Sequence, residues 1–368
     1  MKRKLTIIMV YRIITWGVSI LAAIFLLSFV SLLGYRAYLE RATRIETLNG
    51  ISSLEEISLG NIKQWIFIRG TDQNNPVLIF LHGGPGVPFL GMPSSRTEDA
   101  ELIKNFTVVH WDQRGAGKSF NGDIPEESMT FDRLSEDCNE LIDFIRDRFN
   151  VDKVFLVGHS GGTIIGLKTA YKYPEKIHAY VGVAQIVNDL EQQRISYNFI
   201  VEEAEKTGNA NNVKAIEAIG PPPFGSLDVF TKKDKFVSRF GGIYHGKNSI
   251  PMWILGLSFL TSPEHSLFEG IETLSMKGFD FTMNTMYKEY MSIDLTDEIR
   301  SMKVPVYFFE GKFDMAIPLE PVKIFFDSLV AENGKLFIIF ENSGHFPMVE
   351  EKEKYQELLI NIVLKDTQ

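Results

Sequence analysis

An apolar stretch at the N-terminus dominates the hydrophobic pattern of the chain. Residues 13–33 carry no charge, and a helix over this range is long enough to cross the hydrocarbon core of a bilayer. A slight basic excess before it favours a cytoplasmic N-terminus. A cleaved signal peptide is the alternative, but no small-x-small cleavage motif follows the run. We predict a single-pass protein of the cell membrane, with a cytoplasmic segment over 1–12, a transmembrane anchor over 13–33, a stalk over 34–50 and the rest extracytoplasmic.

Beyond residue 50, short apolar runs alternate with segments of helical periodicity. Residues 131–149 illustrate the helical pattern, because their apolar positions recur three and four residues apart. A hairpin signal at Gly60-Asn61 joins the first two apolar runs. Strands alternating with helices indicate a mostly parallel sheet with helices on both faces. The expected strands cover residues 54–58, 64–68, 76–81, 106–110, 153–157, 179–183, 304–309 and 335–340.

The alternation stops over residues 188–299. This stretch contains helical segments, many aromatic residues and a Gly-Pro-Pro-Pro turn at 220–223. We therefore predict an α/β fold of the hydrolase type, with a core over 51–187 and 300–368 and an inserted helical cap over 188–299. Open parallel sheets bind ligands at the carboxyl ends of their strands, so the cap is expected to cover the functional site.

A G-x-S-x-G motif at 158–162 lies between an expected strand and an expected helix. A sharp strand-to-helix turn needs small residues around a serine so that its hydroxyl projects from the sheet edge. The helix that follows points its N–H groups and its positive dipole end at developing negative charge. The motif therefore makes Ser160 the candidate nucleophile of a serine hydrolase.

A serine hydroxyl needs a base, and in this fold the acid and then the base follow the nucleophile along the chain. His345 is the only histidine in the last hundred residues, and it follows an expected strand. Asp314 lies on the loop after the strand at 304–309, where a carboxylate could orient the imidazole. Glu310, at the end of the same strand, is the rival acid. We predict a triad of Ser160, Asp314 and His345.

Two backbone N–H groups are needed to stabilise the oxyanion. One belongs to the residue after the nucleophile, Gly161, and the other to the loop after the third strand. That loop is His-Gly-Gly-Pro-Gly at 82–86, and Gly84 is the expected donor. Its glycines allow the backbone to approach a substrate carbonyl closely.

These motifs resemble those of the proline iminopeptidase family of α/β-hydrolases. The resemblance rests on residues 82–86, on Trp-Asp-Gln-Arg-Gly-Ala-Gly-Lys-Ser at 111–119 and on the Ser160 elbow. It implies a hydrolase core with a helical cap and the metal-free release of an N-terminal residue, often proline. The chain departs from the family in having Gly161 where tryptophan is common, and Ala116 where cysteine is frequent.

Cap carboxylates hold the α-amino group of the substrate in that family. Three acidic residues in the expected cap are the candidates for this role in the present chain, and a solvated helix face is the plainer interpretation of their spacing. They are Glu202, Glu203 and Glu205.

Composition excludes several other classes of function. The net charge of −9 leaves no basic stripe for nucleic acid, and the single cysteine, Cys138, excludes an internal disulfide. The Gly-Lys-Ser at 117–119 resembles a phosphate-binding loop, but aspartate occupies position 112 where that loop needs glycine. Neither H-E-x-x-H nor a Cys/His cluster is present, so neither a metal nor another cofactor is expected.

Three functions fit these observations. The first is a membrane-anchored aminopeptidase that releases N-terminal residues from short peptides through an acyl-enzyme. The second is a carboxylic-ester hydrolase with the same triad, in which an aromatic-rich cap holds an apolar group. The third is a non-catalytic protein that uses the cap for binding. The cap aromatics behind the second hypothesis are Trp253, Phe259, Phe268 and Tyr287.

Overall fold

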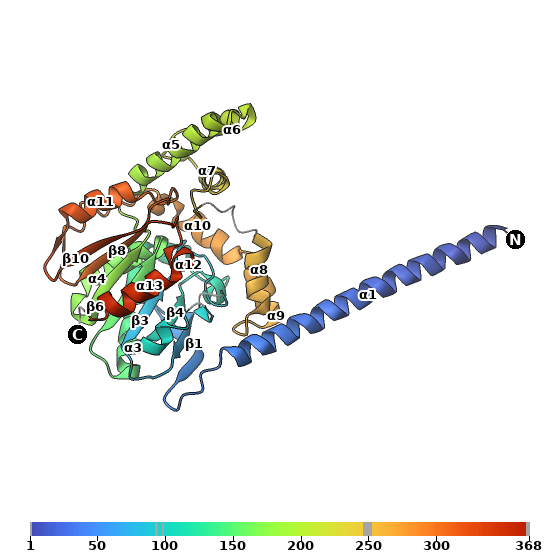
Figure 1. The fold of residues 1–368 in the computed structure, drawn as a ribbon, viewed down its shortest axis with the longest axis horizontal. Helices are drawn as coiled ribbons and strands as arrows, with labels where there is room; N and C mark the ends of the chain where they lie inside the picture. The colour runs from blue at the N-terminus through green and yellow to red at the C-terminus, as the bar shows by residue number, and fades with distance from the viewer. Residues whose placement is uncertain (1, 93–94, 98, 246–251, 366–368) are drawn as a thin grey trace.

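The computed structural model describes residues 2–92, 95–97, 99–245 and 252–365. A central sheet with helices on both faces forms the body of the molecule, and one long helix projects from it (Figure 1). The α/β-hydrolase fold expected from the sequence is therefore confirmed.

The main sheet has the strand order β1-β2-β4-β3-β5-β6-β8-β10. β1 and β2 form the antiparallel hairpin predicted around Gly60-Asn61, β2 pairs antiparallel with β4, and the other neighbours are parallel. All parallel strands therefore end at one edge of the sheet. The strands are β1 Ile51–Leu59, β2 Ile62–Gly70, β3 Val77–Leu81, β4 Thr107–Asp112, β5 Val154–His159, β6 Ile177–Val183, β8 Val306–Gly311 and β10 Lys335–Phe340, and a small separate pair joins β7 Ser301–Met302 to β9 Val330–Ala331.

Two hydrophobic cores cover the two faces of the sheet. The larger core packs α3 (Phe131–Phe149), α4 (Gly161–Lys172) and α11 (Leu319–Ser328) against one face. The other core contains α2 (Leu102–Asn105) and α13 (Lys352–Leu358), which follows the short α12 (Pro347–Glu350). The central strands β3, β4, β5, β6 and β8 are buried on both faces, which explains why they read as nearly continuous apolar runs, whereas the edge strands β1 and β10 are only partly buried.

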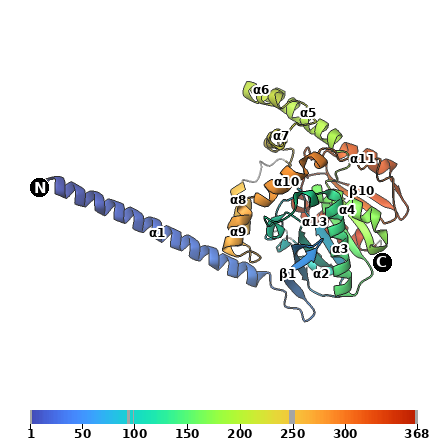
Figure 2. The same cartoon turned by 180° about the vertical axis from the view of Figure 1, so that it is seen from behind.

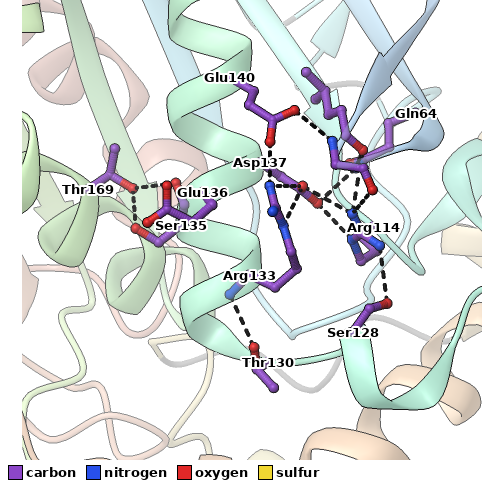
Figure 3. A network of polar contacts seen from close by, with 12 residues as sticks. Gln64, Arg114, Ser128, Thr130, Arg133, Ser135, Glu136, Asp137, Glu140 and Thr169 are labelled. Atoms are coloured by element: carbon purple, nitrogen blue, oxygen red, sulfur yellow. Dashed lines mark hydrogen bonds and ion pairs between the residues drawn. The ribbon is translucent and has the colours of Figure 1, made fainter.

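A buried network around the ion pair of Arg114 with Asp137 joins the β1–β2 hairpin to helix α3 (Figure 3). Arg114 donates to the carboxylate of Asp137 through Nε at 2.7 Å and Nη2 at 3.1 Å, and Gln64 Nε2 donates to the same carboxylate at 2.9 Å. Arg114 also donates to the carbonyl oxygen of Gly60 at 3.1 Å. The arginine of the 111–119 motif is thus fully engaged in holding the hairpin on α3.

The segment between β6 and β7 is helical. It contains α5 (Asp189–Thr207), α6 (Ala210–Ile219), α7 (Leu227–Arg239), α8 (Met252–Thr261), α9 (Leu267–Leu274) and α10 (Lys277–Tyr290). These helices lie along the side of the body where the parallel strands end (Figures 1 and 2). Residues 188–299 thus have the helical character expected of a cap.

The N-terminal helix α1 (Lys2–Ala42) leaves the body beside α8 and α9 and projects away from it (Figures 1 and 2). Its stretch from Met9 to Ala42 is long and apolar enough to cross a membrane, and none of its most apolar window is buried in the protein. A signal sequence would meet the same criteria of length and composition. The helix continues through residue 42, well into the segment predicted as a stalk.

Candidate active site

Ser160 lies at the sharp turn between β5 and α4. Its backbone has φ 51° and ψ −125°, a conformation that non-glycine residues rarely adopt. The turn is held by hydrogen bonds from Ser160 N to Val183 O at 2.9 Å and from Thr163 N to Ser160 O at 2.8 Å. A side chain at Gly158 would approach the carbonyl oxygen of Gly162 to 2.7 Å. The glycines of the motif therefore allow strand and helix to meet closely enough to form this turn.

The loops after β8 and β10 bring Asp314 and His345 together. His345 Nδ1 donates to Asp314 Oδ2 at 2.7 Å, and Asp314 is almost fully buried. The other carboxylate oxygen of Asp314 accepts from the N–H groups of Ala316 at 2.8 Å and Ile317 at 2.9 Å. These bonds fix the carboxylate, and the carboxylate in turn fixes which imidazole nitrogen carries hydrogen.

The rival acid, Glu310, does not contact His345. Its Oε1 accepts from Gln185 N at 3.1 Å, and burial raises its pKa well above the ordinary value. Burial therefore favours the neutral form of Glu310, which joins β8 to the end of β6.

Gly161 and Gly84 lie against each other beside Ser160. A side chain at Gly161 would collide with the carbonyl oxygen of Gly84, and one at Gly83 would lie 3.0 Å from the Cβ of Ser160. Gly84 has φ +118°, which also favours glycine. In this structure the close approach leaves no room for a larger side chain at position 161 unless the 82–86 loop moves.

The 111–119 motif holds the 82–86 loop in place. Asp112 Oδ1 accepts from the N–H groups of Phe89 and Leu90, both at 3.0 Å. Gln113 N donates to His82 Nε2 at 3.1 Å, and Gln113 Nε2 donates to His82 O at 3.0 Å. Burial lowers the pKa of His82 to about 4, so its ring is neutral and Nδ1 donates to Gly83 O at 2.8 Å. Two of the three motifs behind the family resemblance, 82–86 and 111–119, are therefore joined by hydrogen bonds into one unit.

A second histidine, His159, contacts the loop that carries His345. His159 Nε2 donates to the backbone oxygen of His345 at 2.9 Å. Burial, followed by the neighbouring His345, lowers the pKa of His159 to about 3, so this ring is neutral. The residue before the nucleophile thus helps to hold the histidine loop beside the elbow.

A cavity of about 500 Å³ lies next to Ser160 and His345. This volume is in the range of ligand pockets, which measure roughly 300–1,000 Å³. Glycines 83 and 84 form part of the wall, together with residues of the cap. The cap contributes mostly apolar and aromatic side chains together with one amide, one carboxylate and one serine hydroxyl, namely Phe230, Ile243, Tyr244, Phe279, Met283, Tyr290, Gln193, Asp234 and Ser258.

The three glutamates predicted to hold an amine are not among the residues that line this cavity. Glu202 and Glu205 are exposed on α5, and Glu203 forms an ion pair with Lys206 at 2.7 Å. Three of the cap aromatics expected to hold an apolar group are also absent from the cavity lining: Phe259 and Tyr287 are buried and Phe268 is exposed. Other cap aromatics, Phe230 and Phe279 among them, line the cavity instead. The side chain of Trp253 is outside the described part of the structure.

Gln193 and Asp234 are the polar cap residues that sequence reasoning missed. Gln193 is almost fully buried, and its Oε1 has no hydrogen-bond partner among the described residues. Its Nε2 donates to the buried Asp189 at 3.2 Å, whose pKa burial raises to about 7. Spacing on α5 gave a partial signal, since Asp189 and Gln193 are four residues apart on one helix face.

Chemistry outside this site is limited in the described residues. They contain no group of three or more metal-ligating side chains. Cys138 is buried, and burial raises the pKa of its thiol to about 12, so it is not a reactive thiolate.

Comparison with known proteins identifies the family. Residues 76–352 match the family model described as the alpha/beta hydrolase fold. A probable aminopeptidase of Bacillus subtilis, YbaC, is 32% identical over 314 residues, which cover 84% of this chain and 95% of that protein. A proline iminopeptidase of Saccharolobus solfataricus is 25% identical over 310 residues, covering 79% of this chain and 85% of its own.

Solved structures show the same fold. A proline iminopeptidase-related protein of Thermus thermophilus superposes with a TM-score of 0.58 at 17% identity, over 86% of this chain and 98% of that one. A membrane phospholipase A superposes with a TM-score of 0.58 at 16% identity, over 100% of this chain and 99% of that one. On the family match and the sequence identities, this chain belongs to the proline iminopeptidase-like α/β-hydrolases, a group of serine hydrolases.

Proposed function

We propose that the protein is a membrane-anchored serine aminopeptidase that releases N-terminal residues from short peptides. The observation that carries the proposal is the bond between His345 and the buried Asp314 at the cavity that contains the Ser160 elbow. Ser160 Oγ attacks the carbonyl carbon of the first peptide bond while His345 accepts its proton. His345 then protonates the leaving amine, and water hydrolyses the acyl-enzyme by the reverse use of the same base.

The backbone N–H groups of Gly161 and Gly84 are the proposed oxyanion donors. Gly161 is the first residue of α4, so its N–H lies at the positive end of the helix. The two glycines are in close backbone contact beside Ser160. Donors fixed in this way stabilise the developing oxyanion without reorganisation during the reaction.

Gln193 and Asp234, rather than the exposed glutamates of α5, are the proposed binding groups for the substrate's ammonium. The unpartnered Oε1 of Gln193 is a ready acceptor at the buried cap wall. Asp234 forms an ion pair with the buried Lys233 at 2.5 Å, which offsets part of its charge. Asp189, directly behind Gln193, supplies a second carboxylate, and an ammonium ion bound nearby would favour its ionised form.

Helix α1 is the proposed anchor. Its apolar window is exposed to the surroundings of the protein, and bilayer lipid is the environment that favours such a surface. The full-length similarity to a membrane phospholipase A supports the same interpretation. The slight basic excess before residue 13 favours a catalytic portion outside the cytoplasm under the positive-inside rule.

A substrate panel tests the reaction. The full chain, reconstituted in liposomes, is expected to hydrolyse alanyl- and prolyl-arylamides, and Ser160→Ala is expected to abolish that turnover. Turnover of short-chain nitrophenyl esters without any arylamide turnover would instead establish the ester hydrolase.

A pair of cap variants tests amine recognition. Asp234→Asn is expected to raise KM for arylamides that carry a free amine, while leaving the hydrolysis of nitrophenyl acetate unchanged, because that ester has no amine to bind. Glu202→Gln is the matched control, since Glu202 is an exposed cap carboxylate away from the cavity. A larger effect of Glu202→Gln than of Asp234→Asn on KM would contradict the assignment.

A further inference from the structure

Cap helices α8 and α9 lie on the side of the body from which α1 leaves (Figures 1 and 2), and both helices carry exposed large apolar side chains. Phe268 is 69% exposed, Ile271 is 59% exposed and Leu257 is 46% exposed. Phe268 and Ile271 are three residues apart in α9, so they share one face of that helix. Isolated exposed apolar residues are common, but a group of them on two adjoining helices indicates an interaction surface.

The two helices form a rigid unit that is attached to the core. Gly256 of α8 lies against Leu274, and a side chain at Gly270 of α9 would approach the carbonyl oxygen of Phe259 to 2.7 Å. A capping box between Ser266 and Glu269 begins α9. Its exposed apolar face therefore has a fixed position relative to the body.

Glu269 also joins α9 to the 111–119 motif. Its carboxylate accepts from Lys118 Nζ at 2.6 Å, and the ammonium lies 4.4 Å from the ring centre of Trp65. The lysine of the Gly-Lys-Ser sequence thus has a structural role, namely to fix α9 on the hydrolase core.

Helix α1 is attached to the same corner. Arg36 Nη1 donates to the carbonyl oxygen of Leu260, at the end of α8, at 2.7 Å, and Arg36 Nη2 donates to the carbonyl oxygen of His265, just before α9. Helices α1 and α8 are also in contact. We call residues 260–265, which join α8 to α9, the α8–α9 corner. Because Arg36 of α1 binds both of its ends, the position of this corner along the axis of α1 is fixed.

Helix geometry gives the height of this corner relative to the uncharged stretch of α1. Arg36 follows the end of that stretch, Leu33, by three residues, which is a rise of about 4.5 Å at 1.5 Å per residue. The headgroup layer adds roughly 5–8 Å to each side of the hydrocarbon core. With residues 13–33 across the hydrocarbon, the corner bound by Arg36 lies at the level of the lipid headgroups.

We propose that the α8–α9 face, defined by Leu257, Phe268 and Ile271, docks on the lipid bilayer beside the anchor. The inference rests on the anchoring role proposed for α1. The proposed binding partner of this face is lipid, because the face belongs to the helix pair that contacts the anchor α1 at headgroup depth. Ser258 of α8 lines the cavity, so docking would hold one wall of the candidate active site close to the membrane surface.

Site-directed spin labelling of the full chain in liposomes of phosphatidylethanolamine and phosphatidylglycerol tests the proposal. The only native cysteine, Cys138, is buried with a pKa of about 12, so labelling is confined to an introduced cysteine. Phe268→Cys reports on the face, and Leu21→Cys reports on the anchor. Ile324→Cys is the matched control, because Ile324 is 66% exposed on α11, away from α1 (Figure 1).

Collision of each nitroxide with oxygen and with a water-soluble nickel chelate gives its depth. The label at 268 is expected to show an oxygen-to-nickel ratio several-fold above that at 324 and below that at 21, because the α8–α9 face lies at headgroup depth and residue 21 lies within the hydrocarbon. A lipid-like label at 21 with an aqueous label at 268 would overturn the docking while leaving the anchor intact. An aqueous label at 21 would overturn both. Spin–spin broadening at 268 that disappears on dilution with unlabelled protein would assign the face to a second copy of the chain and overturn lipid docking.

Discussion

The strand-end part of the candidate site and its cap wall are built in different ways. At the strand ends, backbone hydrogen bonds and close glycine contacts position Ser160, Asp314 and the 82–86 loop. At the cap wall, single side chains of α5 and α7 reach the cavity, and their environment depends on buried neighbours such as Lys233 and Asp189. The first region is fixed by the path of the main chain, and the second by side-chain packing.

This difference indicates where each kind of change acts. Residues placed by the main chain tolerate no alteration of shape, because the turn or loop that carries them would have to move. Residues placed by packing can be exchanged for others of similar volume while the fold persists. We expect mechanism to reside at the strand ends and substrate selectivity to reside in the cap.

Two carboxylates, Glu310 within β8 and Asp314 on the loop after it, give the largest expected difference in kcat between variants. Asp314→Asn is expected to lower kcat by about 10⁴-fold, because an amide neither holds the required imidazole tautomer nor stabilises the imidazolium. Glu310→Gln is expected to leave kcat nearly unchanged, since burial favours the neutral form of Glu310 and glutamine keeps an acceptor for Gln185 N. Steady-state kinetics on an alanyl-arylamide would measure both. Equal losses would remove the distinction between the two acids.

Alanine substitutions at Gly161 and at Gly122 give the next largest expected difference in kcat. In Gly161→Ala the added methyl group would collide with the Gly84 carbonyl and displace the proposed oxyanion donors, so kcat is expected to fall by roughly 10²–10³-fold. Gly122→Ala is the control, because its added methyl group meets no atom within 4 Å. Thermal unfolding of both variants separates lost stability from lost catalysis. A fully active Gly161→Ala would show that the 82–86 loop is less constrained than the structure implies.

The order of elements along the chain was enough to predict the strand-end region. The Ser160 elbow, the loop with Asp314 and the loop with His345 each follow an apolar run, and parallel strands bring such loops to one edge. Even the choice between Asp314 and Glu310 could be made from position, because a residue within a buried strand faces the core rather than the loop.

The cap wall could not be predicted in the same way. The sequence of 188–299 predicts no strand whose register would fix where its side chains point. The family resemblance therefore indicates acidic cap residues by their type alone. Glu202 and Glu205 are exposed on that helix, while Gln193, earlier in it, reaches the cavity. The helical period of α5 separates these faces, but which face meets the core depends on packing against helices that are distant in sequence.

Asp189 allows the cap wall to be tested by measuring the free energy of unfolding rather than the enzymatic activity. Burial raises the pKa of its carboxyl to about 7, above the value of about 3.9 in an unfolded chain. The group therefore favours folding in its protonated form: this contribution is complete below about pH 4 and is lost as the pH rises through 7. Asp189→Asn cannot ionise and is expected to be more stable than the parent by about 2 kcal/mol at pH 8.5, since relaxation recovers part of the cost of a buried charge.

The difference in stability is expected to shrink on acidification and to disappear below about pH 4, where the carboxyl is protonated in both the folded and the unfolded chain. Urea unfolding at pH 5 and at pH 8.5 would measure it, with Asp123→Asn as the control because Asp123 is exposed and its variant should differ from the parent equally at both values. If Asp189→Asn destabilised the chain equally at both pH values, the carboxyl would be ionised and paired in the folded state. Asp189 would then be a fixed structural anion, and the cap wall would be held as rigidly as the strand ends.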